Sequence, residues 1–456
     1  GPGDVYKRQE ETFAEVCSAT ADEIGQAAEA GQAAFESGWR DMPPGERTRL
    51  LRNLAKRIHE NVETLAQLET SNVGKPIGDA RWEADAGAKV FDYYAGAIGH
   101  LCGQTIPVAR GGFDFTLRQP MGVIAAITPW NFPFLIACWK VAPALAAGNS
   151  VVLKPASLTP LTALMLGQLA QEAGLPDGVL QVVPGSGSEA GNALATHPLV
   201  RKIGFTGSTE VGATIMKLAA DDIKRVSLEL GGKSPNIVFA DADWQRAAAE
   251  SPMSVFANTG QDCCARSRMF IEQSVFDGFV DQFVAATESL KIGDPMDEAT
   301  QVGPMVSAAQ RELSESHIAG ARDAGREIRT GGDRPNGGGF YLNPAVVTGV
   351  ETEDRAWREE IFGPVVCLRP FTDETEMLRE VNDTNFGLSG SVWSNDLSRA
   401  LRVARQVESG VISINSHSSV HTEAPFGGFK RSGLGRDLGM SAMEACTEVK
   451  NIYVGE

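Results

Sequence analysis

Residues 123–155 read VIAAITPWNFPFLIACWKVAPALAAGNSVVLKP. This stretch contains an apolar run at 123–127, a helical pattern that continues to residue 147, and a second apolar run at 151–153. The alternation goes on to residue 230, with further helical patterns and apolar runs at 161–173, 179–183, 189–196, 202–205, 210–219 and 226–230. Strands that alternate with helices over about 110 residues predict a parallel, doubly wound α/β sheet, with ligands at the carboxyl ends of its strands.

The regions around this repeat show other patterns. Residues 44 to about 73 predict one long amphipathic helix, because apolar side chains recur there at three- and four-residue spacing: Leu50, Leu54, Ile58, Val62, Leu65 and Leu68. A second set of strands and helices follows over 235–415. Within 103–120 the segment FDFTLR alternates, which indicates a hairpin outside the main sheet. Residues 1–9 show no apolar periodicity, and we expect them to be a tag remnant or cloning artefact.

Composition limits the class of protein. The chain has 456 residues and a net charge of −17, and at roughly 150 residues per domain it predicts about three domains. A hydrophobic content of 43% and a charged content of 22% are typical of a soluble globular protein. A pI near 4.9 without a basic run argues against nucleic acid or an anionic membrane as partner. The longest apolar run, 129–139, is stopped by Lys140, so we expect no transmembrane helix.

Cysteine usage indicates the compartment. The 7 cysteines are odd in number and scattered. We expect no signal peptide before them. This pattern argues against a disulfide framework and favours a reducing compartment, which we expect to be the cytoplasm. Neither the cysteines nor the 6 histidines show the spacing of metal ligands, so we expect no metal site.

Two glycine-rich turns follow predicted strands. Residues 184–191 read PGSGSEAG, one residue longer than the usual dinucleotide-binding spacing. Residues 205–212 read FTGSTEVG, in which Ser208 can cap a helix whose N-terminus suits a pyrophosphate. Lys154 ends a predicted strand, where a ligand crevice is expected. Each feature also has an ordinary explanation, namely a plain turn, a plain N-cap and a solvated surface lysine.

Two adjacent thiols and one carboxylate are candidates for catalysis. Cys263 and Cys264 lie in NTGQDCCARSR, residues 258–268. A cysteine has a pKa of about 8.5, so a nucleophilic one needs a helix N-terminus, a cation or a base. The alternative is two buried structural cysteines. Glu229 ends an apolar strand, where burial can raise its pKa and make it a base; the alternative is a salt-bridged or capping glutamate.

Seven motifs in this order closely resemble the aldehyde dehydrogenase superfamily: ITPWNFP (127–133), VVLKP (151–155), FTGS (205–208), LELGGKSP (228–235), GQDC (260–263), EEIFGPV (359–365) and PFGGFKRSGLGR (425–436). The resemblance covers essentially everything after residue 10. It implies a doubly wound, Rossmann-like dinucleotide-binding domain over 10–105 and 121–231, and an α/β catalytic domain over 232–430. It also implies a small β oligomerisation segment over 106–120 and 440–456.

The resemblance also implies roles for single residues. Cys263 matches the nucleophile, Asn131 the oxyanion-hole amide and Glu229 the base that activates water, whereas Cys264 matches no catalytic position. The implied cofactor is NAD or NADP, bound by Ile127, Thr128, Pro129, Trp130, Lys154, Ser157, Gly187, Phe205, Gly207, Ser208, Val211, Leu230, Glu360 and Phe362. The implied partners are a small aldehyde, near Phe132, Trp139, Asp262 and Phe426, and further copies of the chain in a homodimer or homotetramer.

Three positions depart from the family pattern. Ser157 stands where many NAD-specific members carry glutamate, Asp437 stands where glutamate is frequent, and Asp262 is uncommon before the nucleophile. Asp262, Trp139 and the TEVKN tail resemble the aminoaldehyde and betaine aldehyde branch. We therefore predict that NADP is accepted alongside NAD, and that aldehydes with a cationic amine are preferred over uncharged aliphatic or aromatic ones.

Three other functions are compatible with parts of the sequence. A coenzyme-A-acylating relative would not need Glu229. A catalytically inactive structural or binding protein of the same fold would be expected to lose Cys263, Glu229 or Asn131, and all three are present. A cysteine hydrolase would need a histidine near Cys263, and none is close in sequence.

Overall fold

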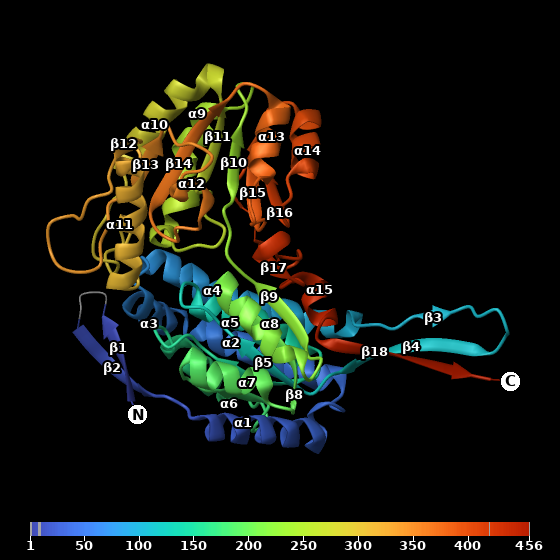
Figure 1. The fold of residues 1–456 in the computed structure, drawn as a ribbon. Helices are drawn as coiled ribbons and strands as arrows, with labels where there is room; N and C mark the ends of the chain where they lie inside the picture. Colours follow the sequence, from blue (N-terminus) through green and yellow to red (C-terminus); the bar gives the residue numbers. More distant parts are fainter. Residues whose placement is uncertain (1, 8–10, 419, 456) are drawn as a thin grey trace.

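Two open α/β sheets, one in each of two lobes, and a projecting β arm form the protein (Figure 1). The computed structural model describes residues 2–7, 11–418 and 420–455. The first sheet lies in the lower lobe of Figure 1, the second in the upper lobe, and the arm extends sideways from the lower one.

The first sheet has the order β17-β9-β8-β5-β6-β7, in which all neighbours are parallel except β17. Its strands are β5 Val123–Ile127, β6 Ser150–Lys154, β7 Leu180–Val182, β8 Val200–Thr206, β9 Arg225–Glu229 and β17 Gly433–Leu434. The chain runs outward from β5 in both directions, which confirms the predicted doubly wound sheet. Ile127 pairs with both Lys154 and Phe205, and Thr206 pairs with Glu229, so four carboxyl ends lie along one edge.

Helices cover both faces of the first sheet. They are α1 Ala21–Ala34, α2 Pro44–Glu60, α3 Val62–Val73, α4 Ile77–Ala97, α5 Pro133–Ala146, α6 Leu161–Glu172, α7 Asn192–Thr196, α8 Thr209–Ala220 and α15 Gly439–Glu444, with short helices η1 Phe35–Trp39, η2 Ile98–His100, η3 Gly187–Gly191 and η6 Lys430–Ser432. Alternate residues of β5 face opposite sides. Ile124 and Ala126 join the core formed with α2, α4, α5 and α6, whereas Val123, Ala125 and Ile127 join the core formed with α1, α7 and α8.

The prediction of one long helix over 44–73 is wrong in one respect, because the helix is broken at Asn61. This residue leaves the helical region with φ −113° and ψ 15°, and ends α2 while preceding α3. The Asn61 amide donates to the carbonyl of Arg57, at 2.8 Å. Asparagine competes in this way with the backbone hydrogen bonds of a helix, and apolar spacing alone does not reveal that competition.

The second sheet has the order β12-β13-β14-β11-β10-β15-β16 and is parallel except for β12. Its strands are β10 Pro235–Val238, β11 Arg268–Glu272, β12 Glu327–Thr330, β13 Ala345–Thr348, β14 Val365–Phe371, β15 Ser389–Trp393 and β16 Val411–Ile414. Its helices are α9 Trp244–Phe256, η4 Ala257–Gly260, η5 Gln273–Val275, α10 Phe276–Glu288, α11 Ala308–Asp323, α12 Arg355–Arg358, α13 Glu374–Asn382 and α14 Leu397–Gln406.

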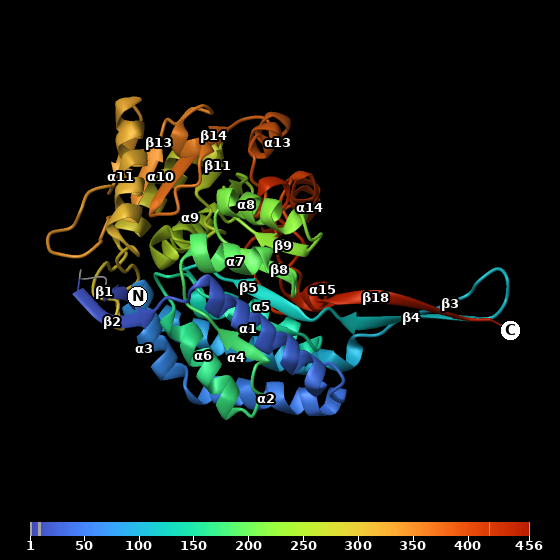
Figure 2. The ribbon, with the colours of Figure 1, turned by 60° about the horizontal axis from the view of Figure 1, so that its bottom comes forward.

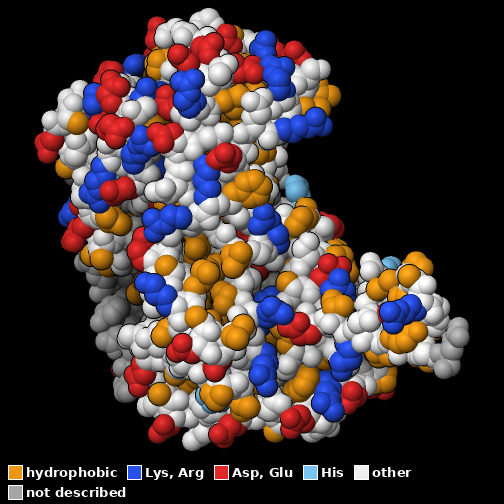
Figure 3. Space-filling view, turned by 45° about the vertical axis from the view of Figure 1, so that its right-hand side comes forward, with side chains coloured by type: hydrophobic (Ala, Val, Ile, Leu, Met, Phe, Trp, Pro, Cys, Tyr) orange, Lys and Arg blue, Asp and Glu red, His pale blue; other side chains and the backbone are white. Residues whose placement is uncertain are grey.

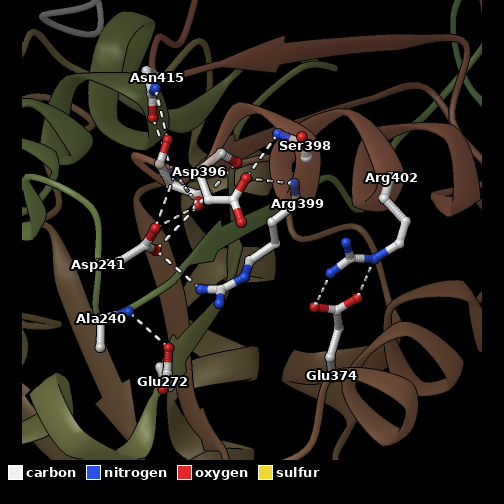
Figure 4. Close-up of polar contacts among 10 residues, drawn as sticks. Ala240, Asp241, Glu272, Glu374, Asp396, Ser398, Arg399, Arg402 and Asn415 are labelled. Carbon is white, nitrogen blue, oxygen red and sulfur yellow. Dashed lines mark hydrogen bonds and ion pairs between the residues drawn. The ribbon is translucent and has the colours of Figure 1, made fainter.

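A polar network closes the carboxyl end of the second sheet, which is where such sheets usually bind ligands (Figure 4). The Asp241 carboxylate accepts from the Ser394 hydroxyl and the Asp396 N–H, both at 3.0 Å. It also accepts from Arg399 at 3.2 Å, and Asp396 caps the following helix. Because these polar groups are hydrogen-bonded to one another, we assign this end a structural role. The amino ends of the strands face the first sheet instead.

The arm combines a hairpin and a late strand. Strand β4 Phe113–Pro120 pairs along its whole length with β18 Thr447–Val454, and β3 Thr105–Ile106 pairs with its other side. Both ribbon views show the arm extending away from the lobes (Figures 1 and 2). Strand β18 starts only at Thr447, because the residues before it, 439–444, form helix α15, which packs on α5 in the first lobe.

Two further predictions concern the N-terminal region and membranes. Strand β1 Pro2–Lys7 pairs with β2 Glu11–Cys17, although residues 1–9 show no apolar periodicity. The origin of residues 1–9 as a tag stays a prediction. Among the described helices, none has the length and apolar composition that spanning a membrane requires.

Candidate active site

The carboxyl edge of the first sheet meets the amino edge of the second, and the predicted catalytic residues lie at this junction. Glu229 ends β9, and Asn131 follows β5 in the loop before α5. Cys263 lies between η4 and β11. The junction therefore brings together residues from three segments that are far apart in the sequence.

The loop that carries Cys263 has an unusual backbone. Asn258 and Thr259 have φ values of +49° and +58°, which non-glycine residues seldom adopt. A Cβ on Gly260 would lie 2.2 Å from the carbonyl oxygen of Gly363, so only glycine fits. Gln261 fixes the loop by donating to the Asn258 carbonyl at 3.0 Å and accepting from a backbone N–H at 2.8 Å. The strain is held in place by this packing, as is frequent at functional sites.

A turn places the two thiols and Asp262 on one side of the loop. The Ala265 N–H donates to the Asp262 carbonyl at 3.1 Å, and the Asp262 carboxylate accepts from the Cys264 N–H at 2.8 Å. Cys264 is buried, as the structural alternative expects, whereas Cys263 is only half-buried. Of the two thiols, Cys263 is therefore the more accessible.

The environment of Cys263 disfavours its thiolate. Its pKa lies well above the ordinary value, first because of a hydrogen bond with the Cys264 thiol, then because of burial and the charge of Asp262. A negative charge beside a thiol disfavours its ionisation. At neutral pH the resting side chain is a thiol, so it needs a base during the reaction.

Asn131 lies against the same loop. Its side chain is buried, and Nδ2 donates to the carbonyl of Gln261 at 3.0 Å. Asn258 returns a hydrogen bond to the Asn131 carbonyl at 2.9 Å. An amide nitrogen carries two N–H groups, so the second one can donate to an oxygen held near Cys263.

Glu229 is a buried carboxylate without hydrogen-bond partners among the described residues. It is 4% exposed, and neither carboxylate oxygen has a hydrogen-bond partner among the described residues. The alternative of a salt-bridged or capping glutamate is therefore wrong. Its pKa is raised well above the ordinary value, first by burial and then by the charge of Asp437, while Lys140 and Arg436 act in the opposite direction.

A buried ion pair lies beside Glu229. The Lys140 ammonium is 2.8 Å from Asp437, and both side chains are buried. A Cβ on Gly427 would lie 2.6 Å from a Glu229 oxygen, so this glycine leaves the room that the carboxylate occupies. Lys140 was recognised in the sequence only as the end of an apolar run; its role depends on a residue almost 300 positions later, Asp437.

The adenosine side of the predicted cofactor site contains Lys154 and Ser157. The Lys154 ammonium donates to the carbonyls of Pro155 at 2.7 Å and Gly185 at 2.9 Å, and Ser157 donates to Gly185 at 3.0 Å. Burial lowers the pKa of Lys154 to about 8. The alternative of a solvated surface lysine is therefore wrong.

The other cofactor residues lie along the same junction. Ser208 caps α8, accepting from the Val211 N–H at 3.3 Å, and Gly212 allows α8 to approach Leu230. Glu360 accepts from the Gly232 N–H at 2.9 Å, and burial raises its pKa to about 7. Seven more of the predicted residues are buried or half-buried at the strand ends or in the adjoining loops: Ile127, Thr128, Pro129, Trp130, Phe205, Gly207 and Phe362. Gly187 is exposed, at the start of η3.

These residues fit a dinucleotide. The hydroxyls of Thr128 and Thr206 are buried at strand ends and have no partner among the described residues. A Cβ on Gly187 would meet nothing within 4 Å, so space is open there. A cleft of about 670 Å³ opens beside the N-terminus of α8. Arg358 and Arg431 line it, together with the carboxylates of Glu210, Glu359, Glu360 and Asp383. Helix N-termini and guanidinium groups are suitable donors for a pyrophosphate.

The predicted substrate residues fall into two groups. The rings of Trp139 and Phe426 are both buried, with centroids 5.4 Å apart. Phe132 has the Lys75 ammonium 4.3 Å from its ring centroid, a contact that the sequence did not indicate. Lys75 also pairs with Glu83, whose carboxylate accepts from a backbone N–H in the first turn of α5.

Asp262 lines a pocket of about 340 Å³ together with Cys264, Glu250, Arg266 and His417. The Arg266 guanidinium is buried and donates to the carbonyl of Cys264 and to two serine hydroxyls. The sequence does not indicate this anchor for the thiol loop, because the two serines, Ser389 and Ser391, lie far along the chain.

Known proteins resemble this chain along almost its whole length. A sequence model described as the aldehyde dehydrogenase family matches residues 4–452. Betaine aldehyde dehydrogenase 1 of Oryza sativa subsp. japonica is 43% identical over 453 residues, which cover 97% of this chain and 90% of that protein. Phenylacetaldehyde dehydrogenase of Pseudomonas fluorescens is 42% identical over 455 residues, again covering 97% and 90%. The solved NAD+ complex of an aldehyde dehydrogenase from Bacillus cereus matches with a TM-score of 0.98 and 40% identity, covering 100% of this chain and 93% of that one.

Proposed function

The chain belongs to the aldehyde dehydrogenase family, and from this premise we propose that Cys263, Asn131 and Glu229 carry its reaction. The enzyme oxidises an aldehyde to the carboxylic acid with NAD or NADP. Nothing in the relatives favours an inactive or coenzyme-A-acylating alternative. The observation that carries the assignment is the half-buried Cys263 thiol on a strained loop to which the Asn131 amide donates.

The first step forms a bond between the Cys263 sulfur and the aldehyde carbon, while the thiol proton passes to solvent water, which serves as the base for this step. The aldehyde oxygen gains negative charge, which the Asn131 amide and the Cys263 N–H stabilise. The coenzyme, when bound, accepts the hydride whose loss turns this thiohemiacetal into a thioester. The direct assay is the appearance of reduced coenzyme with an aldehyde in the absence of coenzyme A; a requirement for coenzyme A would contradict the proposal.

Glu229 then takes a proton from water, and the resulting hydroxide attacks the thioester to release the acid and restore the Cys263 thiol. A carboxylate whose pKa is raised by burial is a stronger base than an exposed one. The Lys140–Asp437 pair lies beside Glu229 and can pass the proton onward, despite the short side chain of Asp437.

The cofactor residues bind and orient the coenzyme. Lys154 and Ser157 would hold the adenosine ribose, and the α8 N-terminus with Ser208 would hold the pyrophosphate. Glu360 and Phe362 would hold the nicotinamide ribose. Phe362, held at φ +54° with its ring at a right angle to that of Trp130, is fixed against the loop that precedes Asn131.

Ser157 is expected to permit NADP. A glutamate here would repel the 2′-phosphate; two unit charges about 4 Å apart interact by about 4 kcal/mol at an effective dielectric of about 20. We expect Ser157→Glu to lower kcat/KM for NADP at least about tenfold while NAD is retained. The control is Ser157→Gln, which has the same length without the charge. A wild type that rejects NADP, or a Glu variant with unchanged NADP preference, would contradict this prediction.

We propose that aldehydes with a cationic amine are preferred. Asp262 and Glu250 place two carboxylates in the pocket beside the thiols, and the His417 there is neutral because burial lowers its pKa to about 3. The Arg266 guanidinium in the same pocket and the Lys75 charge against Phe132 act in the opposite direction. Overall identity does not decide between a cationic and an uncharged substrate. The chain is 43% identical to a betaine aldehyde dehydrogenase and 42% identical to a phenylacetaldehyde dehydrogenase.

The substrate test compares 4-aminobutanal with pentanal, which has nearly the same shape and no charge. The attraction between the amine cation and the aromatic rings of the substrate site is about 0.5–2 kcal/mol. It corresponds to a preference for 4-aminobutanal of about two- to thirtyfold in kcat/KM. Asp262→Asn should reduce the preference. If the wild type favours pentanal and the variant loses nothing toward the amine, the enzyme is a general aldehyde oxidiser.

We also propose that the arm joins copies of the chain. β18 is an edge strand whose outer side pairs with no other described strand, and such an edge readily adds a strand from a second chain. Its residues Val449 and Tyr453 are 58% and 51% exposed. Hydrophobic side chains are visible on the surface of the arm at the lower right of Figure 3.

The double variant Val449→Asp/Tyr453→Asp should shift the protein from a homo-oligomer to a monomer, because charges on an edge strand oppose pairing. Size-exclusion chromatography with light scattering measures this directly. Leu397→Asp is the control, since Leu397 is 63% exposed on α14, away from the arm. An unchanged mass for the double variant would place the interface elsewhere.

The cytoplasmic location also stays a proposal, supported by 7 unpaired cysteines.

A further inference from the structure

Three consecutive side chains converge at the nucleophile. The carboxylate of Asp262 and the sulfurs of Cys263 and Cys264 offer three ligand atoms that lie within 4.8 Å of one another. Neighbouring side chains in an extended segment point to opposite sides, but the turn at 262–265 and the Asp262–Cys264 N–H bond bring these three together. We propose that this cluster is a capture site for thiophilic divalent cations, Zn²⁺ above all, through which metal reversibly blocks the enzyme.

The geometry and chemistry suit Zn²⁺. Zinc binds thiolate at about 2.3 Å and carboxylate at about 2.0–2.2 Å, so two sulfurs on a tetrahedral ion lie roughly 3.8 Å apart. Small side-chain rotations bring three atoms that are already within 4.8 Å to that spacing. Each thiol loses its proton to solvent when it binds, and the metal keeps its charge, so no oxidant is needed. Three protein ligands leave the fourth position to water.

A path to the site exists. The pocket of about 340 Å³ reaches Asp262 and Cys264, and Glu250 adds a second carboxylate to its wall. Arg266 also lines the pocket, but its guanidinium donates to the Cys264 carbonyl and the hydroxyls of Ser389 and Ser391, which hold it in place. His417 bonds to Ser251 and Ser391 through its two ring nitrogens and is not counted as a ligand.

The sequence did not indicate this site, because structural zinc motifs separate their cysteines by two or more residues, whereas here the ligands are adjacent. The inference that binding inhibits rests on the proposed role of Cys263, since a sulfur bound to metal cannot attack an aldehyde. Binding itself does not depend on that role, and it can therefore be measured separately.

The test uses full-length enzyme that is reduced with a phosphine, treated with EDTA and desalted. ZnCl₂ is added in competition with a metal-binding dye, and alkylation of Cys263 by iodoacetamide is followed by peptide mass spectrometry. We expect one tightly bound equivalent, protection of Cys263, and loss of activity that EDTA restores. Cys264→Ser and Asp262→Asn should each weaken binding at least about tenfold, and Cys102→Ser, at an exposed cysteine elsewhere, should not.

The outcomes separate the two proposals. Zinc affinity that is unchanged in both Cys264→Ser and Asp262→Asn would overturn the capture site, because the metal would then lie elsewhere or on Cys263 alone. Absence of a tight equivalent in the wild type would also overturn it. A Cys263→Ala variant that remains active would instead overturn the proposed catalytic role, whatever its affinity for zinc. Glu250→Gln tests the general charge of the pocket and should change the affinity less than Asp262→Asn.

Discussion

Replacing Cys263 by alanine is expected to abolish aldehyde oxidation, whereas Cys264→Ala keeps most of it. Loss of a covalent nucleophile costs about ten-thousand-fold or more in turnover. The half-buried Cys263 lies two residues after Gln261, to whose carbonyl the Asn131 amide donates, and Cys264 lies deeper in the apolar core. The measurement is the steady-state rate of coenzyme reduction for both variants, with coenzyme binding followed by fluorescence to show that the site is intact.

Cys264→Ala should also make Cys263 easier to ionise. The hydrogen bond that the neutral Cys263 thiol donates to the Cys264 sulfur is the largest of the effects that raise the Cys263 pKa, so its removal lowers that pKa. Iodoacetamide should then alkylate Cys263 at a lower pH than in the wild type. If Cys264→Ala were the inactive variant and Cys263→Ala the active one, the assignment of the nucleophile would be wrong by one residue.

Glu229→Gln is expected to separate the two halves of the reaction. The thioester still forms, because Cys263 and Asn131 are unchanged, but no base activates water. Removing a general base costs about a hundred- to ten-thousand-fold. Stopped-flow measurements should therefore show one burst of reduced coenzyme, close to one equivalent per site, followed by very slow turnover. A missing burst would show that Glu229 acts earlier, for example in deprotonating Cys263.

The raised pKa of Glu229 also fixes the direction of the pH dependence. Water activation needs the ionised carboxylate, and a raised pKa means that this form disappears at a higher pH than for an exposed glutamate. Hydrolysis of the thioester should therefore weaken as the pH falls, with the loss beginning well above the ordinary glutamate range. Asp437→Asn removes a charge that raises this pKa and should move the loss to lower pH. A profile that does not move would exclude electrostatic coupling between the two carboxyl groups.

The fold and the site were predictable to different degrees. Strand β5 occupies Val123–Ile127, as predicted, because a buried parallel strand is a continuous apolar run bounded by turn residues. The break at Asn61 was not predicted, since it results from one side chain bonding to the backbone. The candidate catalytic residues came from motifs. Lys140 and Arg266 could not be predicted, because their partners Asp437 and Ser389 are distant in the sequence. Lys75 pairs with Glu83 nearby, but its contact with the Phe132 ring depends on the fold.

The surroundings of Glu229 are completed by a part of the chain that is synthesised very late. Gly427 and Asp437 lie about 200 residues beyond Glu229, on the segment that leaves the second lobe and adds β17 to the first sheet. A growing polypeptide on the ribosome would thus carry Cys263 and Glu229 long before the wall around the carboxylate exists. Until the last segment docks, Glu229 would lack the wall that raises its pKa, and the Cys263 site would be incomplete. Docking of the last segment, which closes contacts of very long sequence separation, is therefore the step of folding that makes the enzyme active.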